Sequence, residues 1–529
     1  GYAIQEWAGS KRIGLMLEGH GREQLTEEMD LSRTVGWFTS IYPVVLDLEG
    51  AETIGSGIKK VKESLRKIPR KGVGYGMLKY LTEEGRDRLN NKVEPELSFN
   101  YLGQIDGGGQ KGLFRYREGS TGSYTASQNR RPRILEINSQ VMDGRLNVHI
   151  GYSTHLHSKE TISSFSEKFI DTLKKIITHC CEEKHFGYTP SDFPLAKINQ
   201  EQLDEVFGDI PNIEDIYPLS PMQEGLLFQK LFHPKSNAYL VQSLFKVNQK
   251  LDVDIFKRSW ELLIGHYDIL KTGFKYDHLP HFLQFVSRKV KIPWEEYDYS
   301  SLSKEELEGK LNDLFQQDRE QEFDLEKPPL LRFHLIKVSH DYYYLIFTFH
   351  HILIDGWCSS ILMNDLATIY SRLIERKIPK LLPQKSYRTF IEWLSTYDYT
   401  QTKEFWKTYL KDINITKLTD SIIKKDHSDI DDEFSNYQYT LSSVQSQALK
   451  DFAKTEQVTL NVLFQAAWYL LLRYYTQQPD ITFGAIQSGR SIPIDGIDRM
   501  IGLFINALPM RINLDDQEGT VKDLLKVLS

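Results

Sequence analysis

The sequence predicts an α/β protein, an α+β sandwich, arranged as more than one domain. Segments in which apolar and polar residues alternate are mixed with segments that have an apolar residue every three or four positions, which indicates strands and helices around shared cores. Residues 11–48 and 480–514 show the same order of features, which indicates two related domains in tandem. A chain of 529 residues is long enough for several such cores.

The first part of the chain is expected to contain strands followed by one long helix. Apolar and alternating runs predict strands at residues 13–17, 97–102, 133–137 and 146–152. A helical period predicts a helix over residues 160–181. Residues 115–133 are rich in Ser, Thr, Gly and Arg without an apolar period, which predicts a loop.

A domain boundary is expected where prolines interrupt the helical pattern. Pro190, Pro194 and Pro211 lead to an acidic pair at Glu214 and Asp215. The predicted division is a first domain at residues 1–195, a linker at 196–213, a lobe at 214–385 and a second lobe at 386–529.

The second domain is expected to alternate helices and strands. The predicted helices are residues 221–231, 253–266 and 359–377, and the predicted strands are 238–247, a strand into Phe274, 331–338 and 342–349. The last two strands should form a hairpin around Ser339 and His340. That hairpin would bring the residues after Phe349 to an edge of a sheet.

The two repeated segments carry matching residues. Each runs from a strand through a Gly-Arg turn and a polar stretch to a Gly-x-Phe sequence and a proline. The Gly-x-Phe sequences are residues 36–38 and 502–504. We expect both segments to form the same strand-turn-strand unit.

Composition excludes several classes of function. The net charge is −7 and no dense run of Lys and Arg occurs, which excludes nucleic acid and membrane surfaces as partners. No apolar stretch approaches the roughly 18 residues that span a bilayer. The three cysteines, Cys180, Cys181 and Cys358, lack metal-ligand spacing and fit a reducing cytoplasm. The chain begins with Gly1 rather than Met, so we interpret it as a fragment whose missing signal peptide says little.

The most informative stretch follows the predicted hairpin. His350 and His351 end a strand, and Asp355 and Gly356 follow closely. An imidazole can act as a base or a hydrogen-bond acceptor near neutral pH. The Asp is placed to pair with a cation and fix the loop, and the Gly would let a thioester approach the backbone. The alternative is a strand that ends in two histidines with satisfied hydrogen bonds.

This stretch resembles the HHxxxDG motif of condensation domains in nonribosomal peptide synthetases. Further segments, in order, are similar to successive condensation-domain motifs: Tyr217 to Gly225, Tyr387 to Trp393 and Ile501 to Asn506. Earlier segments resemble, in order, motifs from the back half of a peptide synthetase epimerization domain: Glu18 to Glu23, Arg33 to Pro43, Lys71 to Gly76 and Phe99 to Gln104. The resemblance implies lobes of the chloramphenicol-acetyltransferase-like fold, in the condensation/epimerization superfamily.

The resemblance also implies an order of domains and a substrate class. Residues 1–195 would be the C-terminal part of an epimerization domain, and the following condensation domain would be incomplete at its C-terminus. Ser220 to Gly225 and Gly356 to Cys358 resemble the subclass that accepts a donor ending in a D residue. Neither active site would be complete, so we expect the isolated fragment to be inactive.

For the condensation part, the resemblance assigns roles around the His pair. His351 would remove the amine proton or orient the amine, and His350 would hold the loop. Asp355 would be structural, paired with a cation. The family usually has an Arg where this chain has Lys271, so either Lys271 or Arg332 is the expected partner of Asp355. Gly356 would keep the substrate passage open.

For the epimerization part, the resemblance makes Glu18 the proton carrier at Cα. Glu18 ends an apolar strand, where we expect desolvation to raise its pKa. His20 and Arg22 would orient it or stabilise the enolate, and a structural role for Arg22 is equally open. Tyr101 would donate a hydrogen bond to the enolate. A solvated Glu18 and a buried structural Tyr101 are the alternatives.

The resemblance further implies partners. Upstream and downstream peptidyl carrier domains would deliver both substrates on 4'-phosphopantetheine, beside adenylation domains, and no cofactor would be bound by the chain itself. Two other classes stay open. One is a non-catalytic platform that binds carrier proteins, and the other is a stand-alone acyltransferase that uses coenzyme A.

Overall fold

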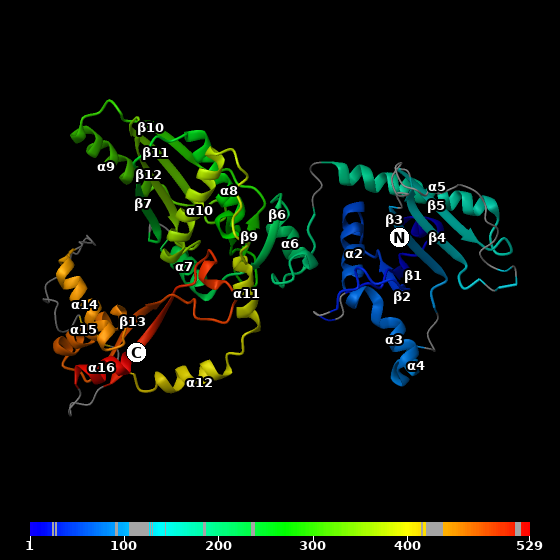
Figure 1. Ribbon diagram of the computed structural model, residues 1–529. Coiled ribbons are helices and arrows are strands. Elements are labelled where there is room, and N and C mark those ends of the chain that lie inside the picture. The colour runs from blue at the N-terminus through cyan, green and yellow to red at the C-terminus, as the bar shows by residue number, and fades with distance from the viewer. Residues whose placement is uncertain are drawn as a thin grey trace. The chain divides into compact units, whose positions relative to one another are not determined.

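The computed structural model describes residues 1–23, 26, 29–89, 94–104, 126, 128, 129, 131–142, 144–182, 187–233, 238–413, 416–418, 437–513 and 520–529 (Figure 1). These residues form two compact units. The first unit contains residues 1–216 and 276–281, and the second contains residues 217–275 and 282–529. Most of the loop predicted at residues 115–133 lies outside the described residues.

The first unit is built on a five-stranded mixed sheet of order β2-β1-β3-β4-β5. The strands are β1 (Arg12–Gly19), β2 (Ser40–Asp47), β3 (Leu97–Gln104), β4 (Leu135–Met142) and β5 (Arg145–Tyr152). The inner pairs β1–β3 and β3–β4 are parallel, whereas β1–β2 and β4–β5 are antiparallel. All four strands predicted in this part are confirmed.

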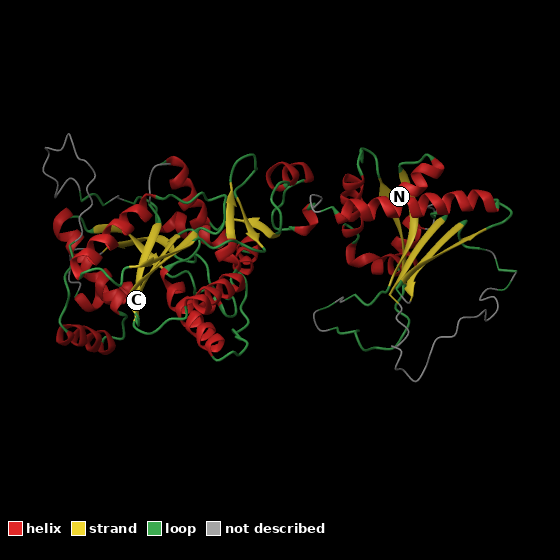
Figure 2. Ribbon diagram, turned by 90° about the horizontal axis from the view of Figure 1, so that it is seen from above, coloured by secondary structure: helices red, strands yellow, loops and turns green. Residues whose placement is uncertain are grey.

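Helices cover one face of this sheet, as Figure 2 shows with helices in red and strands in yellow. Leu97 and Phe99 of β3 face α1 (Tyr2–Ala8), α2 (Ile54–Arg66) and α5 (Lys159–Cys181) in a continuous apolar core. The predicted helix at 160–181 is therefore confirmed. The short helices α3 (Val73–Leu81) and α4 (Glu83–Leu89) follow α2 in the chain.

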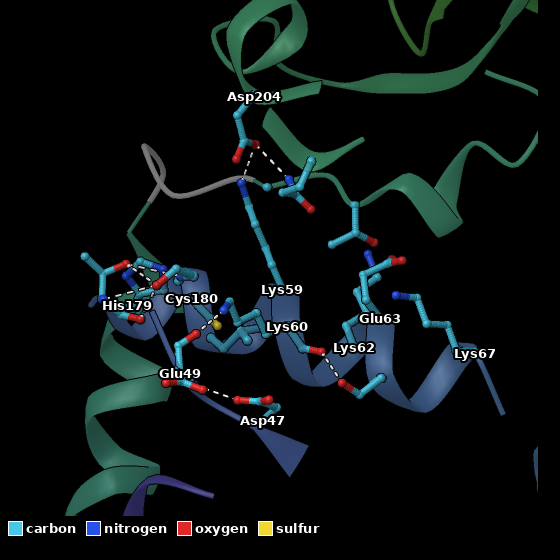
Figure 3. A pocket seen from close by; sticks show the side chains of 18 residues that line it. Asp47, Glu49, Lys59, Lys60, Lys62, Glu63, Lys67, His179, Cys180 and Asp204 are labelled. Carbon is cyan, nitrogen blue, oxygen red and sulfur yellow. Dashed lines mark hydrogen bonds and ion pairs between the residues drawn. The ribbon is translucent and has the colours of Figure 1, made fainter. Parts of the chain in front are cut away.

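The segment after α5 packs on α2 instead of crossing solvent. It contains α6 (Gln200–Phe207) within the linker predicted at 196–213, and Ala196, Leu203 and Phe207 are buried. An open groove of about 1180 Å³ lies between α2, the end of α5 and this segment (Figure 3). Two of its lysines have acidic partners: Lys59 binds Asp204 at 2.6 Å and Lys62 binds Asp192 at 2.5 Å. These ion pairs attach the segment to the first unit.

The second unit begins with a four-stranded sheet of order β10-β11-β12-β7. The strands are β7 (Leu240–Val247), β10 (Trp294–Asp298), β11 (Leu331–Ser339) and β12 (Tyr342–His350). β8 (Thr272–Lys275) and β9 (Leu283–Ser287) pair antiparallel within a separate three-stranded sheet. β11 and β12 pair antiparallel with Ser339 opposite Tyr342, so the predicted hairpin is confirmed and its turn is His340 and Asp341.

Helices pack on both faces of the four-stranded sheet. On one face Trp260 of α8 (Val253–His266) contacts the rings of Phe333 and Phe347. On the other face α9 (Lys304–Glu320) places Leu311 and Leu314 against β11 and β12. The remaining helices of this part are α7 (Pro221–Phe232) and α10 (Gly356–Ile374). The predicted helices at 221–231, 253–266 and 359–377 are present.

The rest of the second unit holds a strand pair, β13 (Asp480–Gln487) and β14 (Asn506–Asn513). The helices are α11 (Tyr387–Thr396), α12 (Thr400–Tyr409), α14 (Ser443–Thr455), α15 (Leu460–Thr476) and α16 (Val521–Leu528). Buried Tyr469 and Leu472 of α15 pack with Ile481 and Ile512 of the two strands and with Leu525 of α16. This core supports the second repeated segment.

The two repeated segments form the same strand-turn-strand unit, as predicted. β1 pairs antiparallel with β2 over eight residues, and β13 pairs with β14 in the same way. The glycine of each Gly-Arg turn has a positive φ, 67° at Gly21 and 66° at Gly489. A Cβ there would lie 1.5 Å from the Phe38 carbonyl oxygen or 1.8 Å from the Phe504 carbonyl oxygen, so only glycine fits.

Candidate functional site

The His pair lies at the end of the central strand β12. His350 is the last residue of the strand and pairs with Leu240 of β7. The next residue, His351, donates its backbone N–H to the Tyr239 carbonyl oxygen at 2.7 Å. Tyr239 has a φ of 71°, a left-handed conformation that is costly for a bulky residue. The backbone is therefore strained at Tyr239, the residue whose carbonyl oxygen fixes the backbone of His351.

His350 is buried and serves the loop. Its Nδ1 accepts a hydrogen bond from the Ile352 backbone N–H at 3.2 Å, so the neutral ring carries its proton on Nε2. Burial lowers the pKa of His350 to about 4, and the nearby charges of Lys230 and His351 act in the same direction. His350 is thus neutral near pH 7, in agreement with a role in holding the loop.

Asp355 is buried at the start of α10. It occupies the N-cap position, yet its carboxylate does not cap the helix. Oδ2 instead accepts the Phe504 backbone N–H at 3.0 Å, and Oδ1 lies 3.4 Å from Nη2 of Arg490. The carboxylate therefore connects residues 350–355, the His loop, to the turn between β13 and β14.

The partner predicted for Asp355 is wrong. Lys271 pairs with Asp268 at 3.4 Å, and Arg332 pairs with Asp318 at 2.5 Å. Lys271 has its acid in the same short helical turn and Arg332 has its acid on α9, whereas Arg490 comes from the repeated Gly-Arg turn more than a hundred residues after Asp355. Arg490 also donates from Nη1 to the carbonyl oxygens of Ile497 and Met500, at 2.6 and 2.8 Å.

Residues 356–358 complete the junction between the His loop and the turn after β13. A Cβ on Gly356 would meet no atom within 4 Å, so a side chain there would project into open space. Trp357 donates its indole N–H to the Asp498 carbonyl oxygen at 2.9 Å. The Cys358 thiol is buried 3.3 Å from Oδ1 of Asp355 and 3.2 Å from the Gly502 carbonyl oxygen. Burial and then the Asp355 charge raise the pKa of this thiol to about 12.

The first unit places Glu18 differently from the prediction. Its side chain is exposed at the end of β1, so the expected desolvation is absent from the described structure. Oε2 of Glu18 accepts a hydrogen bond from Nδ2 of Asn100 at 2.8 Å. Asn100 lies within the Phe99 to Gln104 motif but was not predicted as a site residue, because an amide next to Tyr101 on a strand carries no chemical signal of its own.

Tyr101 follows Asn100 on β3 and therefore points to the opposite face of the strand. It is 55% exposed, so the alternative of a buried structural Tyr is also wrong. His20 is exposed, and its Nε2 lies 3.2 Å from Oε1 of Glu23. Arg22 donates from Nη1 to the carbonyl oxygens of Leu31 and Thr34, at 2.7 and 2.6 Å, which is a structural role. The structure thus joins Glu18 to Asn100 rather than to Tyr101.

Two classes of site receive no support from the geometry. Across the described ranges, no group of three or more His, Cys, Asp and Glu side chains is arranged to hold a metal ion. In the same residues, each helix is too short or too polar to cross a membrane.

Comparison with known proteins gives the family. The family model described as "Condensation domain" matches residues 1–197 and 213–529, so both parts of the chain match it. The chain belongs to the condensation domain family. It has the condensation-domain fold predicted from the sequence, with chloramphenicol-acetyltransferase-like mixed sheets.

Several relatives of this condensation-domain chain are large synthases. It is 36% identical to a linear gramicidin synthase protein of Brevibacillus parabrevis, over 97% of this chain and 7% of that protein. It is 35% identical to bacitracin synthase 3 of Bacillus licheniformis, over 96% of this chain and 8% of that protein. It is also 36% identical to a mycosubtilin synthase protein of Bacillus subtilis, over 100% of this chain and 20% of that protein. The chain thus spans a fifth or less of the length of these relatives.

Among solved structures, the starter condensation domain of rhizomide synthetase is similar with a TM-score of 0.49 and 18% identity. That match covers 59% of this chain and 69% of the other. The first condensation domain of the calcium-dependent antibiotic synthetase gives a TM-score of 0.48 and 16% identity, over 59% of this chain and 73% of the other.

The ion pair between Asp355 and Arg490 should make the largest single contribution to the stability of the His loop. We expect Asp355→Ala to cost about 3–5 kcal/mol of unfolding free energy, because it leaves the buried Arg490 charge unpaired. In a double-mutant cycle with Arg490→Met, the two losses should fall short of additivity by about 1–3 kcal/mol. Denaturant unfolding measures each value. Lys271→Ala is the control, and its loss of unfolding free energy should add to that of Asp355→Ala. If the losses of Asp355→Ala and Arg490→Met were additive, the assignment of Arg490 as the partner would be contradicted.

His350 should make the second unit sensitive to acid. Its folded pKa of about 4 lies below the ordinary value of 6.5, so the unfolded chain binds more protons between these values. The unfolding free energy should therefore fall as the pH drops from about 6.5 to about 4, by up to roughly 3 kcal/mol from this residue. His350→Gln should remove that part of the fall, and His266→Gln, at an exposed histidine of α8, should not. If the unfolding free energy of all three proteins fell equally with pH, His350 would be excluded as the source of the acid sensitivity.

Proposed function

We propose that residues 217–529 act in amide-bond formation between two carrier-bound thioesters, as part of a nonribosomal peptide synthetase. The donor is a peptidyl thioester that ends in a D residue, and the acceptor is an aminoacyl thioester. One observation carries the proposal: His351 stands at the end of β12 with its backbone bound to Tyr239, while Asp355 is bound by Arg490 and Phe504. A histidine on such a rigid loop can meet a substrate without further ordering of the chain.

The proposed step exchanges one acyl bond for another. The acceptor amine attacks the donor carbonyl carbon, a C–N bond forms, and the C–S bond breaks. His351 takes the proton of the attacking amine, and the leaving thiolate takes up a proton. Because an α-amino group with a pKa of about 7.7–8.0 is partly neutral at pH 7, orientation supplies more of the rate than proton removal. The other residues of the motif act on the loop, and Gly356 leaves room for the substrate.

The proposed partners follow from the substrates. Peptidyl carrier domains on either side present the 4'-phosphopantetheine arms, and adenylation domains in the same synthetase load them. The names of the relatives support an assembly line, since those synthases are far longer than this chain. The proposed location is the cytoplasm. The D-donor subclass rests on the resemblance of Ser220 to Gly225 and Gly356 to Cys358.

The first unit is proposed to be the rear lobe of an epimerization domain that needs a front lobe to work. The comparison of the two repeats supports this. Val35 and Trp37 are 98% and 90% exposed, whereas their counterparts Ile501 and Leu503 are 3% and 1% exposed. In the second unit that segment packs beneath α11, where Tyr387 donates its hydroxyl to the Leu503 carbonyl oxygen at 2.8 Å. An equivalent cover over Trp37 would also remove water from its side of the sheet.

In this proposal Glu18 exchanges a proton with one face of the substrate Cα. Asn100 holds the carboxylate in place through its 2.8 Å hydrogen bond. A front lobe would supply the second proton carrier on the opposite side, as well as the desolvation that raises the basicity of Glu18. His20 would act on the enolate only in that closed state, whereas Tyr101 points to the opposite face of β3 from Asn100 and Glu18. The isolated chain is therefore proposed to be inactive in epimerization.

His351 is tested by the rate of peptide-bond formation. In the synthetase that contains this chain, with both carriers loaded, His351→Ala should lower the single-turnover rate by about 10² to 10⁴ if it acts as a base, and by less if it only orients the amine. His340→Ala, at the exposed turn of the same hairpin, should keep the wild-type rate. A wild-type rate for His351→Ala would refute catalysis at this loop. Carrier binding without turnover by the wild type would identify a binding platform, and turnover with soluble acyl-coenzyme A would identify the coenzyme A class.

Glu18 is tested by exchange of the substrate Cα proton. In a protein that includes the front lobe, Glu18→Gln should suppress deuterium uptake into a carrier-bound L-aminoacyl thioester and leave peptide-bond formation unchanged, because the two sites lie in separate units. Glu167→Gln, at an exposed position of α5, is the matched control and should keep the wild-type exchange. Mass spectrometry of the released substrate follows the exchange. Rapid exchange by the 529-residue chain alone would show that no second lobe is required.

A further inference from the structure

Two glutamine side chains form a closed amide pair in the second unit. Gln223 of α7 and Gln284 of β9 have no solvent exposure. Nε2 of Gln284 donates to Oε1 of Gln223 at 2.9 Å, and Nε2 of Gln223 donates to Oε1 of Gln284 at 3.3 Å. A buried amide without partners would cost roughly 1–3 kcal/mol, so such a pair persists only where every polar atom is used.

The remaining donor and acceptor positions of the Gln223 amide bind the His loop and the residue before α7. Its Nε2 also donates to the Ile352 carbonyl oxygen at 3.2 Å, and its Oε1 accepts the Ser220 backbone N–H at 3.0 Å. The spare donor of Gln284 goes to the Pro218 carbonyl oxygen at 2.9 Å. Gln223 therefore binds the His loop directly, whereas the described contacts of Gln284 are with Gln223 and Pro218.

Several hydrogen bonds hold the backbone around His351. The N–H of His350 binds the Leu330 carbonyl oxygen, and the N–H of Leu353 binds the His350 carbonyl oxygen. The N–H of His351 binds the Tyr239 carbonyl oxygen, and the N–H of Ile352 binds Nδ1 of His350. The Ile352 carbonyl oxygen is bound by Gln223, and among these contacts it is the one made by a side chain outside the loop and its own strand.

We propose that Gln223 is a positioning residue for His351. Its amide fixes the Ile352 peptide, and that peptide fixes the direction in which the His351 ring leaves the backbone. The inference rests on the proposed function, in which His351 meets the substrate amine. It also gives the Ser220 to Gly225 segment, which sequence resemblance connects only with the choice of donor, a mechanical role in the reaction.

Glutamine suits this position for chemical reasons. The contact needs a donor toward Ile352 and an acceptor toward Ser220 at the same time, and a carboxylate at residue 223 could not donate. Methionine has similar length and volume but neither function. Asparagine keeps the amide but is one methylene shorter, so it cannot reach all of these partners from the same backbone position.

The experiment compares Gln223→Met with Gln284→Met in the synthetase that contains this chain. Each variant removes one half of the same buried pair, so both should lose similar stability in denaturant unfolding. Gln223→Met should lower kcat for peptide-bond formation about 10-fold or more with KM within about threefold, because a shifted His351 slows chemistry rather than substrate binding. Gln284→Met should keep kcat within about threefold. Equal kcat values for the two variants would overturn the proposal, since a purely structural pair predicts equality.

A spectroscopic readout keeps the test independent of turnover. With ¹³C-labelled histidine, the ring signal of His351 is assigned by its loss in His351→Ala. Gln223→Met should shift or broaden this signal, and Gln284→Met should leave it in place. If Gln223→Met does not fold, Gln223→Asn should give the same displacement of the signal, and an unchanged signal in the folded Asn variant would overturn the proposal. A wild-type rate in His351→Ala would instead refute the proposed function, which separates the two failures.

Discussion

The buried ion pair of Asp355 and Arg490 is the constraint on which the arrangement of the second unit depends. A carboxylate and a guanidinium without water are each costly alone, so neither residue can be buried unless the other is present. The pair therefore joins the end of β12 to the turn after β13, two segments that are distant in sequence. The hydrogen bond from the Phe504 backbone N–H satisfies the second carboxylate oxygen and completes the junction.

The His loop combines this junction with contacts of its own backbone. Strain at Tyr239, a neutral His350 and the Gln223 amide all act on residues 350–352. Each contact is small beside the ion pair, yet each fixes a different peptide. A loop held in this way can present one side chain in one direction, which is the property that the proposed reaction needs.

Local patterns in the sequence predicted most of the elements, and contacts between distant segments were harder to predict. The hairpin and its strand-end histidines follow from alternation and from a two-residue turn. The Asp355 partner did not. Lys271 was chosen because it stands where the family usually has an Arg, and Arg332 because it lies on the neighbouring strand, but these two residues pair with Asp268 and Asp318. The signal that could have found Arg490 was the repeat itself, since Arg22 has the same turn and similar carbonyl contacts. Exposure of Glu18 depends on what covers its sheet, which strand patterns do not encode.

The buried Cys358 thiol has a practical consequence. Cys180 and Cys181 are exposed, whereas Cys358 lies inside the junction with its thiol protonated at neutral pH. Alkylating reagents need a thiolate and access, so they should modify the helix-end cysteines of the folded chain and leave Cys358 untouched. Modification of Cys358 would then occur only when the junction opens. The chain thus carries a natural reporter of how often the end of β12 and the turn after β13 separate, readable without any added label.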